Sequence, residues 1–133
     1  MGMKKNKVHS VIDKGYVYIG ANLYKKVNGM IKNGTAEKEL NHRIKKLKRD
    51  EHFTLFGYIE FYNTTKTRLE IIEAHIKDKL EDYFQHVGND HFIVPINKYS
   101  KEDTYALACI MGLCYGIAEA ERRGYQYTIH WVR

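Results

Sequence analysis

The sequence predicts a single α/β (α+β) domain, with a small mixed central sheet flanked by helices in the order ββαβαβαβ. Its 133 residues, 44% of them hydrophobic, fit one hydrophobic core. Segments that alternate like strands are interleaved with segments of helical periodicity. The single proline and the lack of a Ser- or Gly-rich run give no sign of a linker. We expect a basic N-terminal arm at residues 1–14 and one domain at residues 15–133, with a helix–strand extension from about residue 96.

The first two strands are expected to form a hairpin. Residues 15–19 are Gly-Tyr-Val-Tyr-Ile, and aromatic and β-branched residues favour strands. Asn28-Gly29 is a dipeptide typical of a tight hairpin turn. The second strand should follow this turn and end near Asn33-Gly34.

A helix is expected from Thr35, a residue that can cap a helix, to about Arg49. Its apolar positions recur at spacings of four, four and three, as one helical face requires: Ala36, Leu40, Ile44 and Leu47. Residues 53–62 follow as the clearest strand. One predicted face carries Phe53, Leu55, Gly57, Ile59 and Phe61, and the other carries Phe56, Tyr58 and Tyr62. Because both faces are apolar or aromatic, the strand is expected to be central and covered on both sides.

Two further helices and two further strands complete the expected order. They are a helix at about 66–84, a short strand at 91–95, a helix at 101–123 and a last strand at 126–132. Pro95 places the short strand at an edge or marks its end, while Ser100 and Gly124 provide a cap and a stop for the last helix. That helix is apolar nearly all round, and Gly112 and Gly116 allow close approach of another backbone. It is either a central core helix or the seam of a homodimer.

Charge is distributed unevenly along the chain. Residues 1–50 hold 13 Lys and Arg against 4 Asp and Glu, a balance of +9, whereas residues 51–133 hold 9 against 12, a balance of −3. Such asymmetry indicates a half that faces a polyanion. The alternative is a lysine-rich surface that is simply solvated.

Cysteine use and hydropathy favour a cytoplasmic protein. Cys109 and Cys114 lie on one predicted helix but too far around it to pair easily, so we expect two buried thiols in a reducing compartment. Residues 1–8 are polar and basic and lack the apolar stretch of a secretory signal. The longest apolar run, residues 105–118, is shorter than the roughly 20 residues that span a membrane.

One carboxylate stands out on the predicted helix at 66–84. At 100° per residue, Glu73 lies about 40° from Leu69, inside the helix's apolar face. A buried carboxylate costs several kcal/mol unless it is paired or bound to a metal. Glu73 is therefore either a structural ion pair or a metal ligand or general base in a cleft. Arg43, at the border of the first helix's apolar stripe, can pair with Glu73, clamp a phosphate, or lie along the core edge.

These residues resemble the GIY-YIG nuclease superfamily, especially its small phage-type members. Gly15-Tyr16-Val17-Tyr18-Ile19 resembles the opening GIY strand, and Met30-Ile31-Lys32-Asn33-Gly34-Thr35 resembles the YIG strand and its turn. Arg43 stands about where the family has its first-helix arginine, and Glu73 resembles the glutamate of the following long helix. Asn89-Asp90-His91-Phe92 resembles the short closing segment, so the resemblance covers residues 15 to about 95. The YIG tyrosine has no counterpart in this register, where Met30 or Lys32 stands, and Tyr24 could supply it.

The resemblance implies a divalent-metal-dependent endonuclease that hydrolyses phosphodiester bonds of DNA or RNA. Glu73 would hold one Mg²⁺ or Mn²⁺ ion, and Tyr18 would position or deprotonate the attacking water, with Tyr24 as the second tyrosine. Arg43 would bind the scissile phosphate, so Tyr18 and Arg43 should lie close together. The alternatives are a catalytically inactive nucleic-acid-binding or phage regulatory (anti-defence) protein, and an interaction protein without a nucleic-acid role.

The expected partner is nucleic acid, DNA more than RNA, held along its backbone by the basic half of the chain. The residues expected to bind it are Lys25, Lys26, Lys32, Lys45, Lys46, Lys48 and Asn89.

Overall fold

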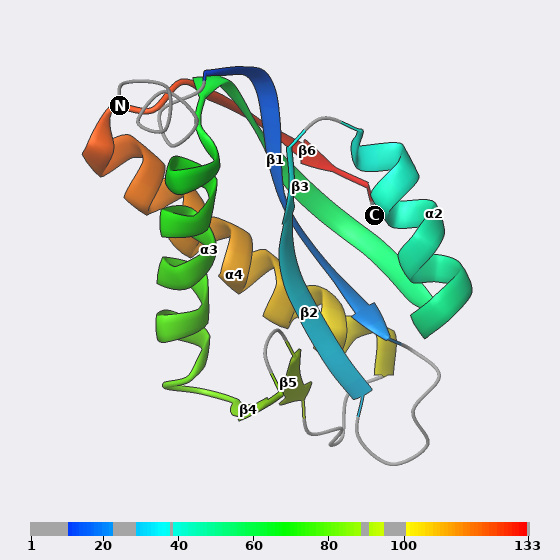
Figure 1. Cartoon of the computed structure of the whole chain (residues 1–133). Coiled ribbons are helices and arrows are strands. Elements are labelled where there is room, and N and C mark those ends of the chain that lie inside the picture. Colours follow the sequence, from blue (N-terminus) through cyan, green and yellow to red (C-terminus); the bar gives the residue numbers. More distant parts are fainter. Residues whose placement is uncertain (1–10, 23–28, 38, 89–90, 95–100, 133) are drawn as a thin grey trace.

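An antiparallel sheet forms the centre of the molecule (Figure 1). The computed structural model describes residues 11–22, 29–37, 39–88, 91–94 and 101–132. The elements are β1 (Ile12–Asn22), β2 (Gly29–Ala36), α2 (Leu40–Glu51), β3 (Phe53–Thr64), α3 (Lys66–Leu80), β4 (Gln85–Val87), β5 (His91–Val94), α4 (Lys101–Arg123) and β6 (Tyr127–Trp131). The strand order across the sheet is β4-β5-β2-β1-β3-β6. The α+β class with flanking helices is confirmed. The sheet is not mixed, however, because all its described pairs are antiparallel, and β4 is an additional strand.

Helices cover both faces of this sheet. α3 and α4 pack on one face, and α2 packs on the other (Figure 1). Side-chain alternation along β1 separates the two layers: Val17 and Ile19 belong to the core under α3 and α4, and Tyr18 belongs to the core under α2. All three side chains are fully buried. β1 therefore contributes to both cores, as a strand paired on both sides can.

The predicted β1–β2 hairpin is present, with a longer first strand than expected. β1 begins at Ile12, so residues 12–14 belong to the sheet rather than to an arm over residues 1–14. The strands pair up to Asn22 opposite Met30. A tight turn at Asn28-Gly29 would instead place Val27 opposite Met30, so the predicted turn is wrong. Three residues that the sequence analysis assigned to a turn, a strand end and a helix cap lie outside the described residues: Asn28, Pro95 and Ser100, respectively.

The predicted helix cap at Thr35 is wrong. β2 continues to Ala36, which lies opposite Tyr16, and Thr35 itself lies opposite Val17. The ladder to β1 holds this backbone extended and so delays the helix to Leu40. The residue before the helix is Glu39, which makes no side-chain capping hydrogen bond.

β3 is the central strand predicted at residues 53–62, and it lies between β1 and β6. The predicted assignment of its faces is wrong, because the face changes partway along the strand. Phe53 and Leu55 pack in the core under α2, whereas Ile59 and Phe61 pack in the core under α4.

A β-bulge causes this change of face. The register between β1 and β3 shifts between Ile19 and Gly20, which makes Phe56 the extra residue. A Cβ atom at Gly20 would collide with the carbonyl oxygen of Thr54. Glycine is thus required where the two backbones approach each other at the bulge.

The apolar face predicted for α3 is confirmed. Its buried residues are Leu69, Ile72, Ile76 and Leu80. The Thr65 hydroxyl caps the helix by accepting a hydrogen bond from the backbone N–H of Arg68 at 3.1 Å. The helix ends at Leu80 rather than near Phe84, since the chain then forms β4 against β5.

The two glycines of α4 face the inside of the domain. A Cβ atom at Gly112 would lie 2.6 Å from Ile19 Cδ1, and one at Gly116 would lie 2.9 Å from Ile59 Cδ1. They therefore allow the helix to approach the sheet, as expected of a core helix.

The two cysteines of α4 differ in exposure. Cys109 is buried in the core, whereas Cys114 is exposed, so the expectation of two buried thiols is wrong for Cys114. Among the described helices, none is long and apolar enough to cross a membrane.

Candidate functional site

Tyr18 and Arg43 lie together, as predicted. Arg43 Nε donates a hydrogen bond to Tyr18 Oη at 3.3 Å. Tyr18 is fully buried, and its ring packs against Phe53 edge to face. Its hydroxyl occupies the space that a Cβ atom at Gly34 would need. The tyrosine is thus enclosed, and Arg43, exposed on α2, is the member of the pair that solvent or a ligand can reach.

Glu73 does not join them, because it lies on the other side of the sheet. Its helix, α3, lies on the face of the sheet opposite α2 (Figure 1). α3 packs in the core of Val17 and Ile19, whereas Tyr18 belongs to the other core. The half-buried Glu73 is tied to the sheet through its backbone: Asn33 Nδ2 donates to Glu73 O at 3.0 Å. The structure therefore brings Tyr18 and Arg43 together and leaves Glu73 apart from them.

The expected Mg²⁺ or Mn²⁺ site is not assembled around Arg43. Among the described residues, no group of three or more His, Cys, Asp or Glu side chains is placed to hold a metal ion. Mg²⁺ can bind through one carboxylate together with substrate phosphates. With the sheet between Glu73 and Arg43, however, an ion at Glu73 cannot bridge to a phosphate at Arg43. The residues therefore do not fit a metal-assisted attack at this place.

The other predicted binding residues fall into two groups. Lys45, Lys46 and Lys48 are exposed on α2. The side chains of five others are not described. Lys32 lies in β2, and four lie outside the described residues: Tyr24, Lys25, Lys26 and Asn89.

α2 presents its charged side to solvent. Leu40 and Leu47 are buried against the sheet, which leaves the intervening polar positions outside. The exposed basic residues are Arg43, Lys45, Lys46, Lys48 and Arg49. Arg49 is paired with the neighbouring Asp50, with its Nε 2.9 Å from Asp50 Oδ1. The helix therefore carries a dense cationic surface, the basic face of α2.

Two hollows lie along α2. The first, the arginine hollow, has a volume of about 560 Å³ and is lined by Thr35, Ala36, Glu37, Glu39, His42, Arg43 and Lys46. The second, the tyrosine hollow, has a volume of about 330 Å³ and is lined by Tyr16, Glu39, Leu40, Asn41, His42, Tyr58 and Glu60. Glu39 and His42 line both hollows, so the two are adjacent.

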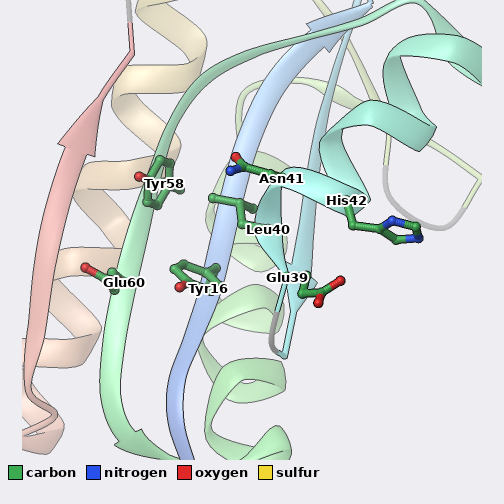
Figure 2. Close-up of a pocket in the computed structure, with 7 residues that line it drawn as sticks. All are labelled: Tyr16, Glu39, Leu40, Asn41, His42, Tyr58 and Glu60. Atoms are coloured by element: carbon green, nitrogen blue, oxygen red, sulfur yellow. The ribbon is translucent and has the colours of Figure 1, made fainter.

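The tyrosine hollow lies where α2 leaves the sheet uncovered. Figure 2 shows Tyr16 and Tyr58 on neighbouring strands, with Glu60 on the side of β6 and Asn41 on the side of α2. The Tyr16 and Tyr58 rings meet edge to face, with centroids 5.9 Å apart. Tyr58 also stacks on His130 of β6, with centroids 4.6 Å apart and an angle of 17° between the rings. The sheet thus offers a fixed aromatic surface beside the basic helix.

Glu60 is held in place among these rings. Its Oε1 accepts a hydrogen bond from Tyr62 Oη at 3.0 Å and lies 3.1 Å from His130 Nε2. Its Oε2 lies 3.8 Å from Lys14 Nζ. Burial raises the pKa of Glu60, but the hydrogen bonds from His130 and Tyr62 and the charge of Lys14 outweigh it, so the pKa is lowered. Glu60 is therefore ionised at neutral pH.

Tyr16 keeps its proton for related reasons. Burial, and then the negative charge of Glu60, raise the pKa of Tyr16. Its hydroxyl is therefore a donor at neutral pH, next to an acceptor-only carboxylate.

Sequence reasoning missed this aromatic surface. The alternation of Tyr58, Glu60 and Tyr62 in β3 was a usable signal, because it places three polar or aromatic side chains on one face. His130 offered no comparable signal, since its position depends on the pairing of β6 with β3.

A separate charged cluster links α3 to the end of α4. Glu119 accepts hydrogen bonds from Arg122 Nη2 at 2.7 Å and from Arg123 Nε at 2.6 Å, and His75 Nδ1 of α3 lies 3.8 Å from its Oε1. The hydrogen bonds from Arg122 and Arg123, aided by His75 and opposed by burial, lower the pKa of Glu119 to about 2. Because its carboxylate is already surrounded by these partners, the cluster is structural.

Comparisons of the chain with family models, with curated proteins and with solved structures gave no match.

Proposed function

We propose that this chain binds nucleic acid through the basic face of α2 and the aromatic surface next to it. The observation that carries the proposal is the density of exposed cations on one short helix, Arg43, Lys45, Lys46 and Lys48. Cations at this spacing neutralise neighbouring phosphates and release counterions, the main source of sequence-independent affinity for nucleic acid. Tyrosine rings at the same surface supply stacking partners for bases.

Binding without cleavage fits the geometry better than the expected endonuclease. A tyrosine that positions or deprotonates water has to reach that water, but Tyr18 is fully buried. A metal ion bound by Glu73 would lie on the opposite side of the sheet from Arg43. The chain is therefore proposed to be the catalytically inactive alternative, a nucleic-acid-binding or regulatory protein.

A Mg²⁺- or Mn²⁺-dependent endonuclease remains the second candidate. One observation favours it, the hydrogen bond between Arg43 and Tyr18, which are the two residues that the GIY-YIG resemblance places in one cleft. Incubation of supercoiled DNA with the protein and Mg²⁺ or Mn²⁺ separates the candidates. Nicking that Glu73→Gln abolishes would favour the endonuclease, and intact DNA at protein concentrations that saturate binding would favour the binding protein.

Three further expectations stay proposals. We propose DNA as the preferred nucleic acid, a cytoplasmic location, and a homodimer through α4. Of the described residues on that helix, Leu107 and Ile110 are 61% and 44% exposed and would lie in the seam. Sedimentation of the wild type and of a Leu107→Glu variant would test the dimer.

Fluorescence anisotropy across a salt titration tests the binding proposal. Neutralising Lys45 and Lys46 with glutamine should weaken binding to a labelled DNA strand. It should also reduce the slope of log K against log salt by about 1.4, or roughly 0.7 for each phosphate of a single strand that the protein no longer neutralises. The matched control replaces Lys66 and Lys79, two exposed lysines of α3, and should leave the slope unchanged. An equal effect of both double variants would contradict the proposal, since it would reflect net charge alone.

A further inference from the structure

We infer that the tyrosine hollow binds an unpaired guanine base of a nucleic-acid strand, an inference that rests on the proposed function. At about 330 Å³, the hollow lies in the size range of small-ligand sites. It combines aromatic walls with the carboxylate of Glu60, held on the side of β6 (Figure 2).

The aromatic wall is suited to a planar ligand. Tyr58 is held between the ring of His130, stacked on it, and the ring of Tyr16, set edge-on to it. Rings that neighbours already hold lose little side-chain freedom when a base packs against them. Stacking of this kind is how proteins bind unpaired bases, and every base offers a π face for it.

Glu60 is the residue that can distinguish one base from another. An ionised carboxylate is an acceptor only, with about four lone-pair sites on its two oxygens. Tyr62 and His130 engage Glu60 Oε1, and Lys14 Nζ lies 3.8 Å from Oε2, so Oε2 can accept further hydrogen bonds. Guanine alone has two neighbouring donors on its Watson–Crick edge, the N1–H and the N2 amino group. Adenine, cytosine and thymine each place an acceptor beside their donor, and a carboxylate repels that acceptor. The chemistry of this wall therefore favours guanine.

The base and the phosphate of a nucleotide are suited to different hollows. The described lining of the tyrosine hollow includes two carboxylates, Glu39 and Glu60, and no Lys or Arg, so a phosphate is disfavoured there. The adjacent arginine hollow is also lined by two acids, Glu37 and Glu39, but its wall contains Arg43 and Lys46, whose side chains can pair with phosphate. A base in the first hollow with its strand's backbone along α2 satisfies both surfaces. Because base pairing hides the Watson–Crick edge, the strand has to be single at this position.

Anisotropy with two matched strands tests the inference. One is an oligothymidylate with a central guanine, and the other carries inosine there, which keeps the N1–H but lacks the N2 amino group. The wild type should bind the guanine strand about tenfold more tightly, a difference in line with the loss of one hydrogen bond to a charged acceptor. Glu60→Gln should remove this preference. Glu70→Gln, an exposed carboxylate of α3, is the matched control and should keep the preference.

The outcomes separate this inference from the proposed function. Equal wild-type affinity for the two strands, with weaker binding of both by the Lys45 and Lys46 variant, would overturn the guanine site and leave nucleic-acid binding intact. Absence of affinity for every strand would overturn both. Free dGMP should bind at least roughly tenfold more weakly than the strand, because it brings no neighbouring phosphates to α2. Equal affinity for dGMP would refute a strand-borne base. The wild-type comparison needs no substitution, so it holds even if Glu60→Gln fails to fold.

Discussion

Replacing Tyr18 with phenylalanine removes one buried hydroxyl and leaves the ring in place. That hydroxyl accepts a hydrogen bond from Arg43 Nε at 3.3 Å. Hydrogen bonds to charged groups contribute about 1.5–3 kcal/mol to stability. Arg43 is exposed and can regain water, so we expect a loss somewhat below that range, about 1 kcal/mol. For a domain of 133 residues this corresponds to a decrease in Tm of about 4 °C.

Urea unfolding monitored by Trp131 fluorescence would measure this loss. A double-mutant cycle with Arg43→Gln should give a coupling energy of about 1 kcal/mol, because each single change breaks the same bond. Tyr83→Phe is the control: its hydroxyl is exposed and lies 3.4 Å from Tyr115 Oη, so its loss should be near zero. Additive effects of Tyr18→Phe and Arg43→Gln would refute the reasoning. A loss above about 3 kcal/mol would also refute it, since the hydroxyl would then be fixing the packing itself.

Three other predictions follow from the structure. Glu119→Gln should destabilise the protein at neutral pH. Because the folded-state pKa of Glu119 is lowered to about 2, this difference in Tm should shrink as the pH falls from about 4.5 towards 2, and a constant difference would contradict the assignment. Gly20→Ala should destabilise the protein by about 3 kcal/mol or more, because the added Cβ atom would collide with the Thr54 carbonyl oxygen. Gly88→Ala should cost only about 1–2 kcal/mol: its φ of 65° strains an alanine, but the added Cβ atom would meet no neighbouring atom within 4 Å. The midpoints of denaturant unfolding would rank the two variants. A thiol reagent should modify the exposed Cys114 quickly in the native protein and Cys109 only after unfolding, since burial also raises the pKa of Cys109; mass spectrometry of a labelling time course would check the order.

Local patterns predicted the elements whose surroundings are uniform. The apolar face of α3 follows from helical spacing alone, and β3 was recognisable because apolar and aromatic residues occupy both of its faces. The proximity of Tyr18 and Arg43 was also predictable, because a strand and a helix that pack together bring the side chains facing each other into contact.

Features that depend on long-range pairing were not predictable. Thr35 has the chemistry of a helix cap, but pairing with Val17 keeps it in the strand. Glu73 lies on the apolar side of its helix, yet nothing in its neighbourhood reveals which face of the sheet that helix covers. Likewise, Cys114 is exposed because it lies on the side of α4 that faces away from the sheet. The sequence of this helix is apolar nearly all round, so it does not indicate which side that is.

The extra residue, Phe56, changes which side chains of β3 face each side of the sheet. Without it, strict alternation from Phe53 onward would send Tyr58 and Glu60 under α4 and turn Ile59 and Phe61 out to solvent. With it, one strand supplies the core beneath α2 first, the core beneath α4 next, and an open chemical surface between Tyr16 and His130 at the same time. The polarity of the sheet's open face is thus set by the count of residues in the strand as much as by their identity. Deleting a single residue here would invert that face while changing almost nothing in the composition of the chain.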